Sequence, residues 1–137
     1  MRAKQIPANV AAIAALPALE QVETIRQGIG AQVFDQLALA LGVGKESLAR
    51  KLNINAQTLR KRKSRVLSAD EAEKSLRAAR VFGLATEVLE TEDKAREWLN
   101  DQIPALGGKR PLDLLDTDVG AHEVTNLLQC IKWGMYA

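Results

Sequence analysis

The sequence predicts an all-helical fold. Apolar residues recur three and four positions apart in several segments, which is the spacing of one face of a helix. No segment shows the sustained alternation of apolar and polar residues that marks a half-buried strand, so we expect no sheet. The chain has 137 residues, of which 47% are hydrophobic, with only four prolines and nine glycines. This composition allows a buried core and argues against disorder.

The charge is distributed unevenly along the chain. Residues 1–65 carry a formal charge of +7 and residues 66–137 carry −5, which gives the total of +2. A basic half next to an acidic half indicates two surfaces with different partners. The single cysteine excludes an internal disulfide and suits a reducing compartment. The apolar run at residues 10–16 is too short for a membrane span or a secretion signal, so we expect a cytoplasmic protein.

The front of the chain predicts an arm and two helices. The arm covers residues 1–21 and includes a short helical turn near residues 10–16. A short helix follows, and then a longer one at residues 31–41, which Gly42 ends. The apolar residues expected to face inward are Val22, Ile25 and Ile29 on the short helix and Val33, Phe34, Leu37 and Leu41 on the longer one.

Residues 45–65 predict two short helices joined by a tight turn. Leu48 and Leu52 face inward on the first helix. Asn53 can adopt the positive φ that ends a helix sharply, and Asn55 can cap the next helix by accepting a backbone N–H. This pattern is typical of a helix-turn-helix, in which the second helix reads the major groove of DNA.

The second helix of this unit is strongly basic. Five of the six residues from 60 to 65 are Lys or Arg, and such a helix repels itself unless its outer face meets negative charge. Gln can pair with adenine, and Arg with guanine or phosphate. The plainer alternative is a solvated basic face without a DNA role. The residues expected to bind double-stranded DNA are Asn55, Gln57, Thr58, Arg60, Lys61, Ser64 and Arg65, with Gln57 and Thr58 as the base readers.

A capping box opens the longest predicted helix. Ser68 serves as N-cap and Glu71 reaches back to it, so the helix is expected at residues 69–89. Gly83 lies within it and costs about 1 kcal/mol relative to Ala, so it either weakens the helix or allows a close crossing. The inward stripe is expected to be Ala72, Leu76, Ala79, Phe82, Ala85 and Leu89.

Two further helices complete the predicted fold. They cover residues 92–100 and 118–133, and Thr91 and Thr117 precede them as N-caps. Between them, Pro111 opens a short turn, because its missing N–H is not needed at a first helical position. The inward residues expected on the last helix are Val124, Leu127, Leu128, Ile131 and Met135.

No group of residues assembles into a catalytic or metal site. The run GGKR at residues 107–110 lacks the longer glycine spacing of a P-loop and reads as a plain turn. His122 is the only histidine and has no second one to share a metal. Asp113, Asp116 and Asp118 read as a solvated helix start. We therefore expect no enzyme, no cofactor and no bound metal.

The C-terminal residues 131–137, IKWGMYA, combine two aromatic side chains and a methionine. Exposed apolar ends commonly find a partner. Alternatively, Trp133 and Tyr136 pack back onto the core of their own chain. The sequence leaves both readings open.

A set of ordered motifs fills the last third of the chain. They are A-x-x-W-L ending at Trp98-Leu99, the run from Pro104 through Gly107-Gly108 to Pro111-Leu-Asp-Leu-Leu, then Thr117-Asp-x-Gly120, and finally Val124-x-x-Leu127-x-x-x-Ile131-x-x-Gly134. In these motifs the chain resembles the Xre/MbcA/ParS family of antitoxins, which are partners of RES-domain toxins. The upstream helix-turn-helix stands where that family has it, and the resemblance covers residues 22–137.

The resemblance implies an antitoxin of a type II toxin–antitoxin pair with two domains. The Xre-like helix-turn-helix domain, residues 22–67, would bind operator DNA, repress the operon and associate with the nucleoid. The domain at residues 68–137 would form a homodimer and block the active site of a RES-domain toxin that degrades NAD. We expect the toxin-binding residues to be Lys109, Arg110, Lys132, Trp133, Gly134, Met135, Tyr136 and Ala137.

Two other classes of function remain as alternatives. One is a free-standing helix-turn-helix transcriptional repressor whose acidic half dimerises or senses a ligand. The other is a helical adaptor without a DNA role, which the basic helix disfavours. An adjacent gene with a lethal product that binds this chain would separate the antitoxin from both.

Overall fold

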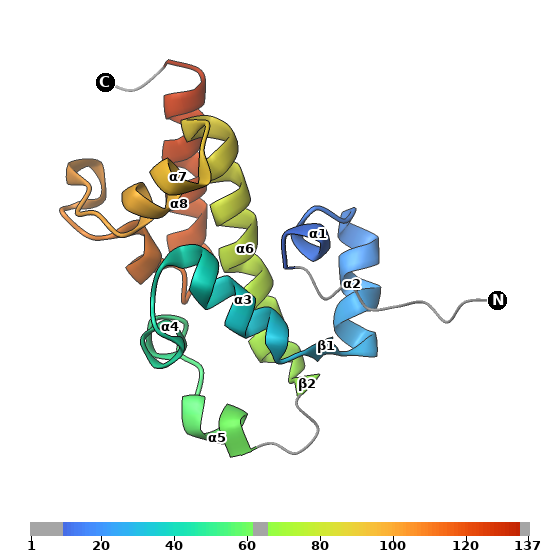
Figure 1. The fold of residues 1–137 in the computed structure, drawn as a ribbon. Coiled ribbons are helices and arrows are strands. Elements are labelled where there is room, and N and C mark those ends of the chain that lie inside the picture. Colours follow the sequence, from blue (N-terminus) through green and yellow to red (C-terminus); the bar gives the residue numbers. More distant parts are fainter. Residues whose placement is uncertain (1–9, 62–65, 135–137) are drawn as a thin grey trace.

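The computed structural model describes residues 10–61 and 66–134 and confirms the all-helical class (Figure 1). Two short 3-10 helices, η1 and η2, and one two-stranded ribbon accompany the α-helices. The elements are α1 (Val10–Ala14), α2 (Ala18–Gln27), β1 (Ile29–Gly30), α3 (Gln32–Leu41), α4 (Lys45–Lys51), α5 (Ala56–Lys61), β2 (Val66–Leu67), α6 (Ala69–Leu89), α7 (Glu92–Leu99), η1 (Pro104–Leu106), η2 (Pro111–Leu114) and α8 (Asp118–Lys132).

Helix α6 is the central element. In Figure 1, α1 and α2 lie to its right and α7 and α8 to its left, while α3 crosses in front of its lower half. The predicted capping box starts it: the Glu71 N–H donates to Ser68 Oγ over 3.2 Å, and the Ser68 N–H donates to Glu71 Oε1 over 2.7 Å. Glu90 ends the helix in a left-handed conformation, with φ of 80°.

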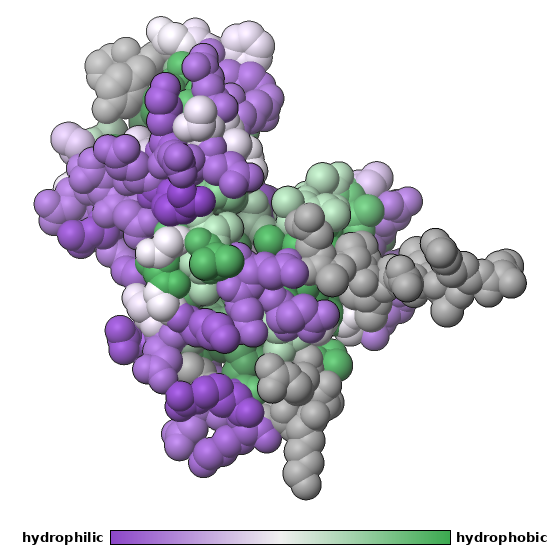
Figure 2. Space-filling model, viewed as in Figure 1, coloured by the Kyte–Doolittle hydropathy of each residue, from purple (hydrophilic) through white to green (hydrophobic). Residues whose placement is uncertain are grey.

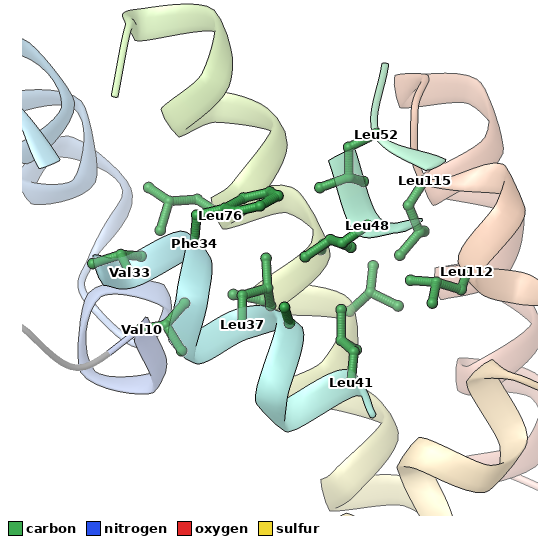
Figure 3. Packing of buried hydrophobic residues seen from close by; sticks show 14 of the residues in the cluster. Val10, Val33, Phe34, Leu37, Leu41, Leu48, Leu52, Leu76, Leu112 and Leu115 are labelled. Carbon is green, nitrogen blue, oxygen red and sulfur yellow. The ribbon is translucent and has the colours of Figure 1, made fainter. Parts of the chain in front are cut away.

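One continuous core joins the front of the chain to its back. The side chains of α3, α4 and α6 meet those of η2 and the residue that follows it, and Figure 3 shows them pointing into one cluster. The cluster includes Phe34, Leu37, Leu41, Leu48, Leu52, Leu76, Leu112 and Leu115. Because α6 packs against both halves, the predicted domain boundary between residues 67 and 68 stays a prediction.

The helix-turn-helix forms as its turn chemistry predicts. Leu48 and Leu52 are fully buried beneath α4. Asn53 adopts a positive φ of 56°, which few residues other than glycine accept. Asn55 Oδ1 then accepts the Thr58 N–H over 2.9 Å and so caps α5. Upstream, Gly42 ends α3 in a left-handed conformation, as predicted.

The prediction for the inward face of α2 was wrong at Val22, whereas Ile25 packs against the core and Ile29, just beyond the helix in β1, is buried. Val22 is 39% exposed, whereas Gln21 and Thr24 are buried. Gln21 faces inward because its amide is fully used: Nε2 donates to the carbonyls of Ala14 and Leu16, and Oε1 accepts from Arg80. A polar side chain with these partners can be buried without an unsatisfied group.

The expectation that no sheet forms was also wrong. Strands β1 and β2 pair antiparallel, with Ile29 opposite Leu67 and Gly30 opposite Val66. Both Ile29 and Leu67 are buried, so the ribbon closes one end of the core. Strands of two residues are too short to show an alternating pattern, and only the fold brings them together.

The C-terminal helices begin at their predicted caps. The Thr91 hydroxyl accepts the Lys94 N–H, and the Thr117 hydroxyl accepts the Gly120 N–H over 3.0 Å. Val124 and Leu128 of α8 are fully buried. Leu127 and Ile131 are only half-buried, and Met135 lies outside the described residues. In the part of the chain that the structure describes, no helix combines the length and apolar character needed to cross a membrane.

Candidate functional site: two interaction surfaces

The predicted DNA-binding residues gather on the exposed face of α5. Gln57, Thr58, Arg60 and Lys61 are all exposed, and so is Asn55 at the start of the helix. On the opposite side of α5, the half-buried Leu59 packs against the core and so positions the helix. Two more predicted residues, Ser64 and Arg65, lie outside the described residues. The described part of the face combines a basic end with three uncharged polar side chains, and this combination suits contact with phosphates and with base edges.

An ion pair ties this face to the first helix of the unit. Arg60 Nη1 lies 2.8 Å from Glu46 Oε1, and each side chain is 65% exposed. A DNA phosphate that approaches α5 therefore competes with Glu46 for the same guanidinium. Behind the turn, Lys74 of α6 donates to the Asn53 carbonyl over 3.0 Å. This bond fixes the helix-turn-helix on α6, and no local sequence pattern signals it.

The second surface lies at the C-terminal end of α8. Trp133 is the C-cap residue and is 68% exposed, and Gly134 follows with a positive φ of 68°. Lys132 Nζ lies 5.5 Å from the centre of the indole ring and 3.1 Å from Glu87 Oε1 of α6. Trp133 thus faces solvent and does not pack on the core of its own chain. Residues 135–137, the rest of the predicted tail, lie outside the described part.

Lys109 and Arg110 occupy a separate loop. Figure 1 shows this loop at the left of the molecule and the end of α8 at the top. Gly107 and Gly108 both have a positive φ, and a bridge between Ile103 and Lys109 closes the turn. Both basic side chains are exposed, and Arg110 Nε donates to the Asn100 carbonyl. The structure therefore places the predicted toxin-binding residues in two clusters and does not join them into one.

Two of the acidic residues near the start of α8, Asp113 and Asp118, are engaged in ion pairs. Asp113 Oδ1 lies 2.5 Å from Lys51 Nζ, and Asp118 Oδ1 lies 2.7 Å from Arg77 Nη2. His122 is exposed. Among the described residues, no group of three or more His, Cys, Asp or Glu side chains is arranged to hold a metal ion.

Two side chains of α7 complete the C-terminal end of α3. Arg96 Nε donates to the Ala40 carbonyl over 2.7 Å, and Asn100 Nδ2 donates to the Leu41 carbonyl over 2.9 Å. Helix α3 has no basic residue in its own last turn, so these groups satisfy carbonyls that its sequence leaves open. Sequence reasoning missed both, because they come from far along the chain.

Two family models match this chain. A model of the antitoxin Xre-like helix-turn-helix domain matches residues 20–80. A model of the antitoxin Xre/MbcA/ParS C-terminal toxin-binding domain matches residues 84–134. The chain belongs to the Xre/MbcA/ParS antitoxin family. The resemblance seen in the sequence motifs is thereby confirmed. Both models end or begin within α6, which therefore serves both domains of this antitoxin.

Curated relatives agree with this assignment. The chain is 28% identical over 130 residues to a protein named Prs ADP-ribosylating antitoxin from Sphingobium sp. (strain YBL2), an alignment that covers 87% of this chain and 82% of the relative. It is 28% identical over 119 residues to an Antitoxin Xre from Yersinia enterocolitica, covering 85% and 80% of the two chains. An Antitoxin Xre from Photorhabdus laumondii is 29% identical over 114 residues, covering 81% and 77%.

Proposed function

We propose that this Xre-family antitoxin neutralises a RES-domain toxin and represses its own operon. The observation that carries the proposal is the exposed Trp133 at the end of the matched toxin-binding domain. A large aromatic side chain with 68% of its surface in water is the kind of residue that anchors a protein interface. The C-terminal end of α8 is thus the part of the chain that enters the toxin's active site.

The name of one relative supports a proposal for the reaction that the toxin catalyses. The Sphingobium relative is named Prs ADP-ribosylating antitoxin. ADP-ribose transfer and NAD degradation both consume NAD, so the toxin of this pair is proposed to be an NAD-consuming enzyme. The antitoxin itself has a binding role and no catalytic one. Cellular NAD should fall when the toxin is expressed alone and should hold when this chain is expressed with it.

Operon repression rests on α5. Its exposed face offers Gln57 and Thr58 to base edges and Arg60 and Lys61 to phosphates. A homodimer would present two such helices to an inverted repeat with half-sites about one helical turn apart. The antitoxin would then act in the cytoplasm, bound to the nucleoid at its operator.

Deletion of residues 133–137 tests the role of the C-terminal end. Cells that express the product of the adjacent gene with the full chain should grow, and cells with the truncated chain should not. Operator binding by the truncated chain should be unchanged, because α5 lies at the other end of the molecule. Full protection by the truncated chain would reject this role.

A free-standing repressor remains the second candidate. The favouring observation is that the helix-turn-helix packs on a buried core formed within the single chain. The adjacent gene decides between the two. A harmless product that does not co-purify with this chain would favour the repressor.

A further inference from the structure

A hollow lies against the inner side of α5, the proposed DNA-binding helix. It is bounded by the start of α3, the first turn of α4 and α5, and its volume is about 480 Å³. Ala31, Phe34 and Leu59 form its apolar wall; the first two are buried and Leu59 is half-buried. Figure 2 shows apolar surface in green between the purple side chains of α5, at the bottom, and the purple side chains above them. Ligand cavities in proteins commonly measure about 300–1,000 Å³, so this hollow is large enough for a small molecule.

Four charged side chains line the same hollow, two of each sign. Lys45 Nζ lies 3.4 Å from Asp35 Oδ1, and Arg60 Nη1 lies 2.8 Å from Glu46 Oε1. The two pairs link α3 to α4 and α4 to α5. Their formal charges cancel, so the hollow favours a molecule without net charge that carries one positive and one negative group.

Both ion pairs can be exchanged for contacts with a ligand. The Lys45 side chain is 63% exposed, and those of Glu46 and Arg60 are 65% exposed. Exposed pairs of this kind are weak, so their replacement costs little. The separation between Lys45 and Asp35 also exceeds the usual length of a hydrogen bond between nitrogen and oxygen, and a closer partner would bind either group more strongly.

We propose that this hollow binds a free amino acid with a large apolar side chain. The apolar side chain of the ligand packs on Phe34 and Leu59, its carboxylate pairs with Lys45, and its ammonium group pairs with Glu46. The two charged groups of an amino acid are attached to the same carbon, so their partners must also lie close together. Lys45 and Glu46 meet this condition, because they are neighbours in the chain and both line the hollow.

The bound amino acid acts on DNA binding through Arg60. Once the ammonium group of the ligand occupies Glu46, the Arg60 guanidinium is released for a DNA phosphate. Operator affinity should therefore rise about two- to fivefold when the ligand is present. By linkage, operator DNA should tighten the binding of the amino acid by the same factor. This coupling rests on the proposed operator repression, whereas the binding of the amino acid does not.

Calorimetric titration of the full chain without DNA tests the site, with L-phenylalanine as the probe. L-phenylalanine should bind. Phenethylamine lacks its carboxylate, 3-phenylpropionate lacks its ammonium group, and glycine lacks its apolar side chain. Each of the three should bind at least about tenfold more weakly, because each leaves one part of the hollow without a partner. Failure of L-phenylalanine to bind, or equal binding of either analogue that lacks a charge, would overturn the proposal.

Substitutions in the hollow locate the binding. Lys45→Gln and Glu46→Gln each remove the partner of one charged group and should weaken L-phenylalanine binding about tenfold. Asp93 and Lys94 are also neighbouring, exposed charged residues, but they lie on α7, so Asp93→Asn and Lys94→Gln are the matched controls and should bind as the wild type does. Circular dichroism checks that all four variants are folded. Wild-type affinity in the Lys45 and Glu46 variants would contradict the proposed site.

Operator titrations with and without L-phenylalanine test the coupling. The wild type should gain two- to fivefold in affinity, by about the effect that the released Arg60 supplies. Glu46→Gln should show no further gain, since its Arg60 is released already. Binding of L-phenylalanine with unchanged operator affinity would reject the coupling. A chain that binds L-phenylalanine but ignores the operator under both conditions would instead count against the proposed function.

Discussion

At the scale of single residues, Arg60 has two competing partners, Glu46 and the proposed DNA phosphate. In the free protein it lies 2.8 Å from Glu46, and both side chains are largely exposed. Exposed pairs of this kind contribute about 0–1 kcal/mol, so a phosphate can displace the carboxylate at little cost. The proposed DNA-binding face of α5 therefore carries an arginine whose ion pair with Glu46 a phosphate can displace.

Removal of either basic residue should weaken operator binding. Arg60→Ala and Lys61→Ala each lose one phosphate contact, so affinity should fall for all sequences alike and the salt slope should drop by about one unit. Fluorescence anisotropy of a labelled operator over a range of salt concentrations measures both. Lys94→Ala, an exposed residue of α7, is the control and should change neither. An unchanged slope in the α5 variants would remove these residues from the interface.

Neutralising the competitor should have the opposite effect. Glu46→Gln frees Arg60 and removes a negative charge close to the DNA, so operator affinity should rise about two- to fivefold. The same anisotropy titration at low salt detects this change. In the Arg60→Ala background the gain should shrink, since the freed partner is then absent. A loss of affinity in Glu46→Gln would show that the carboxylate supports the interface.

Residues with local partners were the most predictable. The cap at Asn55 and the capping box at Ser68 follow from side chains that reach backbone groups three residues away, and the positive φ of Asn53 follows from its residue type. Glu90 shows the limit, because its left-handed conformation at the end of α6 has no signal in its own side chain. Among the predicted site residues, exposure on α5 followed from helical periodicity, whereas their role in binding stays a prediction.

At the scale of elements, α8 packs closely against η2 at Gly120, where a larger residue would not fit. A Cβ added at Gly120 would lie 1.9 Å from the Leu114 carbonyl oxygen, a backbone atom that cannot move aside easily. Gly120 is also the residue whose N–H the Thr117 cap accepts. The start of α8 is thus fixed by close contact between two backbones.

Gly120→Ala should therefore destabilise the protein. We expect the free energy of unfolding to fall by at least about 2 kcal/mol, since the clash forces η2 and α8 apart. Gly83→Ala, at an exposed position of α6 with open space around it, is the matched substitution and should raise it by up to about 1 kcal/mol. Urea titrations followed by circular dichroism compare the two. Equal effects would contradict the packing described for α8.

Features of an element that depend on residues far away in the chain could not be predicted from the sequence. Gln21 and Thr24 are buried on α2 where periodicity favoured Val22, because the carbonyls and the arginine that satisfy Gln21 come from other elements. The ribbon between Ile29 and Leu67 has the same origin. Helix starts, in contrast, were found correctly wherever a hydroxyl or amide cap preceded them.

At the scale of the whole molecule, the two domains share one core. Beyond α6 itself, Lys51 of α4 pairs with Asp113 of η2, and Asn100, the C-cap of α7, donates to the Leu41 carbonyl of α3. The charge asymmetry of the sequence predicted two surfaces for different partners. It could not show that these surfaces are carried by a single packed unit, because the joining contacts link residues about 60 positions apart.

The protein should accordingly unfold in one step. Urea transitions followed by far-ultraviolet circular dichroism and by tryptophan fluorescence should share one midpoint, and the fluorescence change reports mainly on Trp98, which is half-buried on α7, because Trp133 is already exposed. Asn100→Ala leaves the Leu41 carbonyl unpaired and should lower the stability by about 1–2 kcal/mol for both signals together. Two separate transitions would show that the domains fold independently.

The most direct test of the central claim is the growth of cells that express the product of the adjacent gene. That product alone should stop growth, and co-expression of this chain should restore it. The Arg60→Ala and Lys61→Ala variants should restore growth equally well, since neutralisation does not use the α5 face. A product that is harmless alone, or one that stays lethal when this chain is present, would contradict the account.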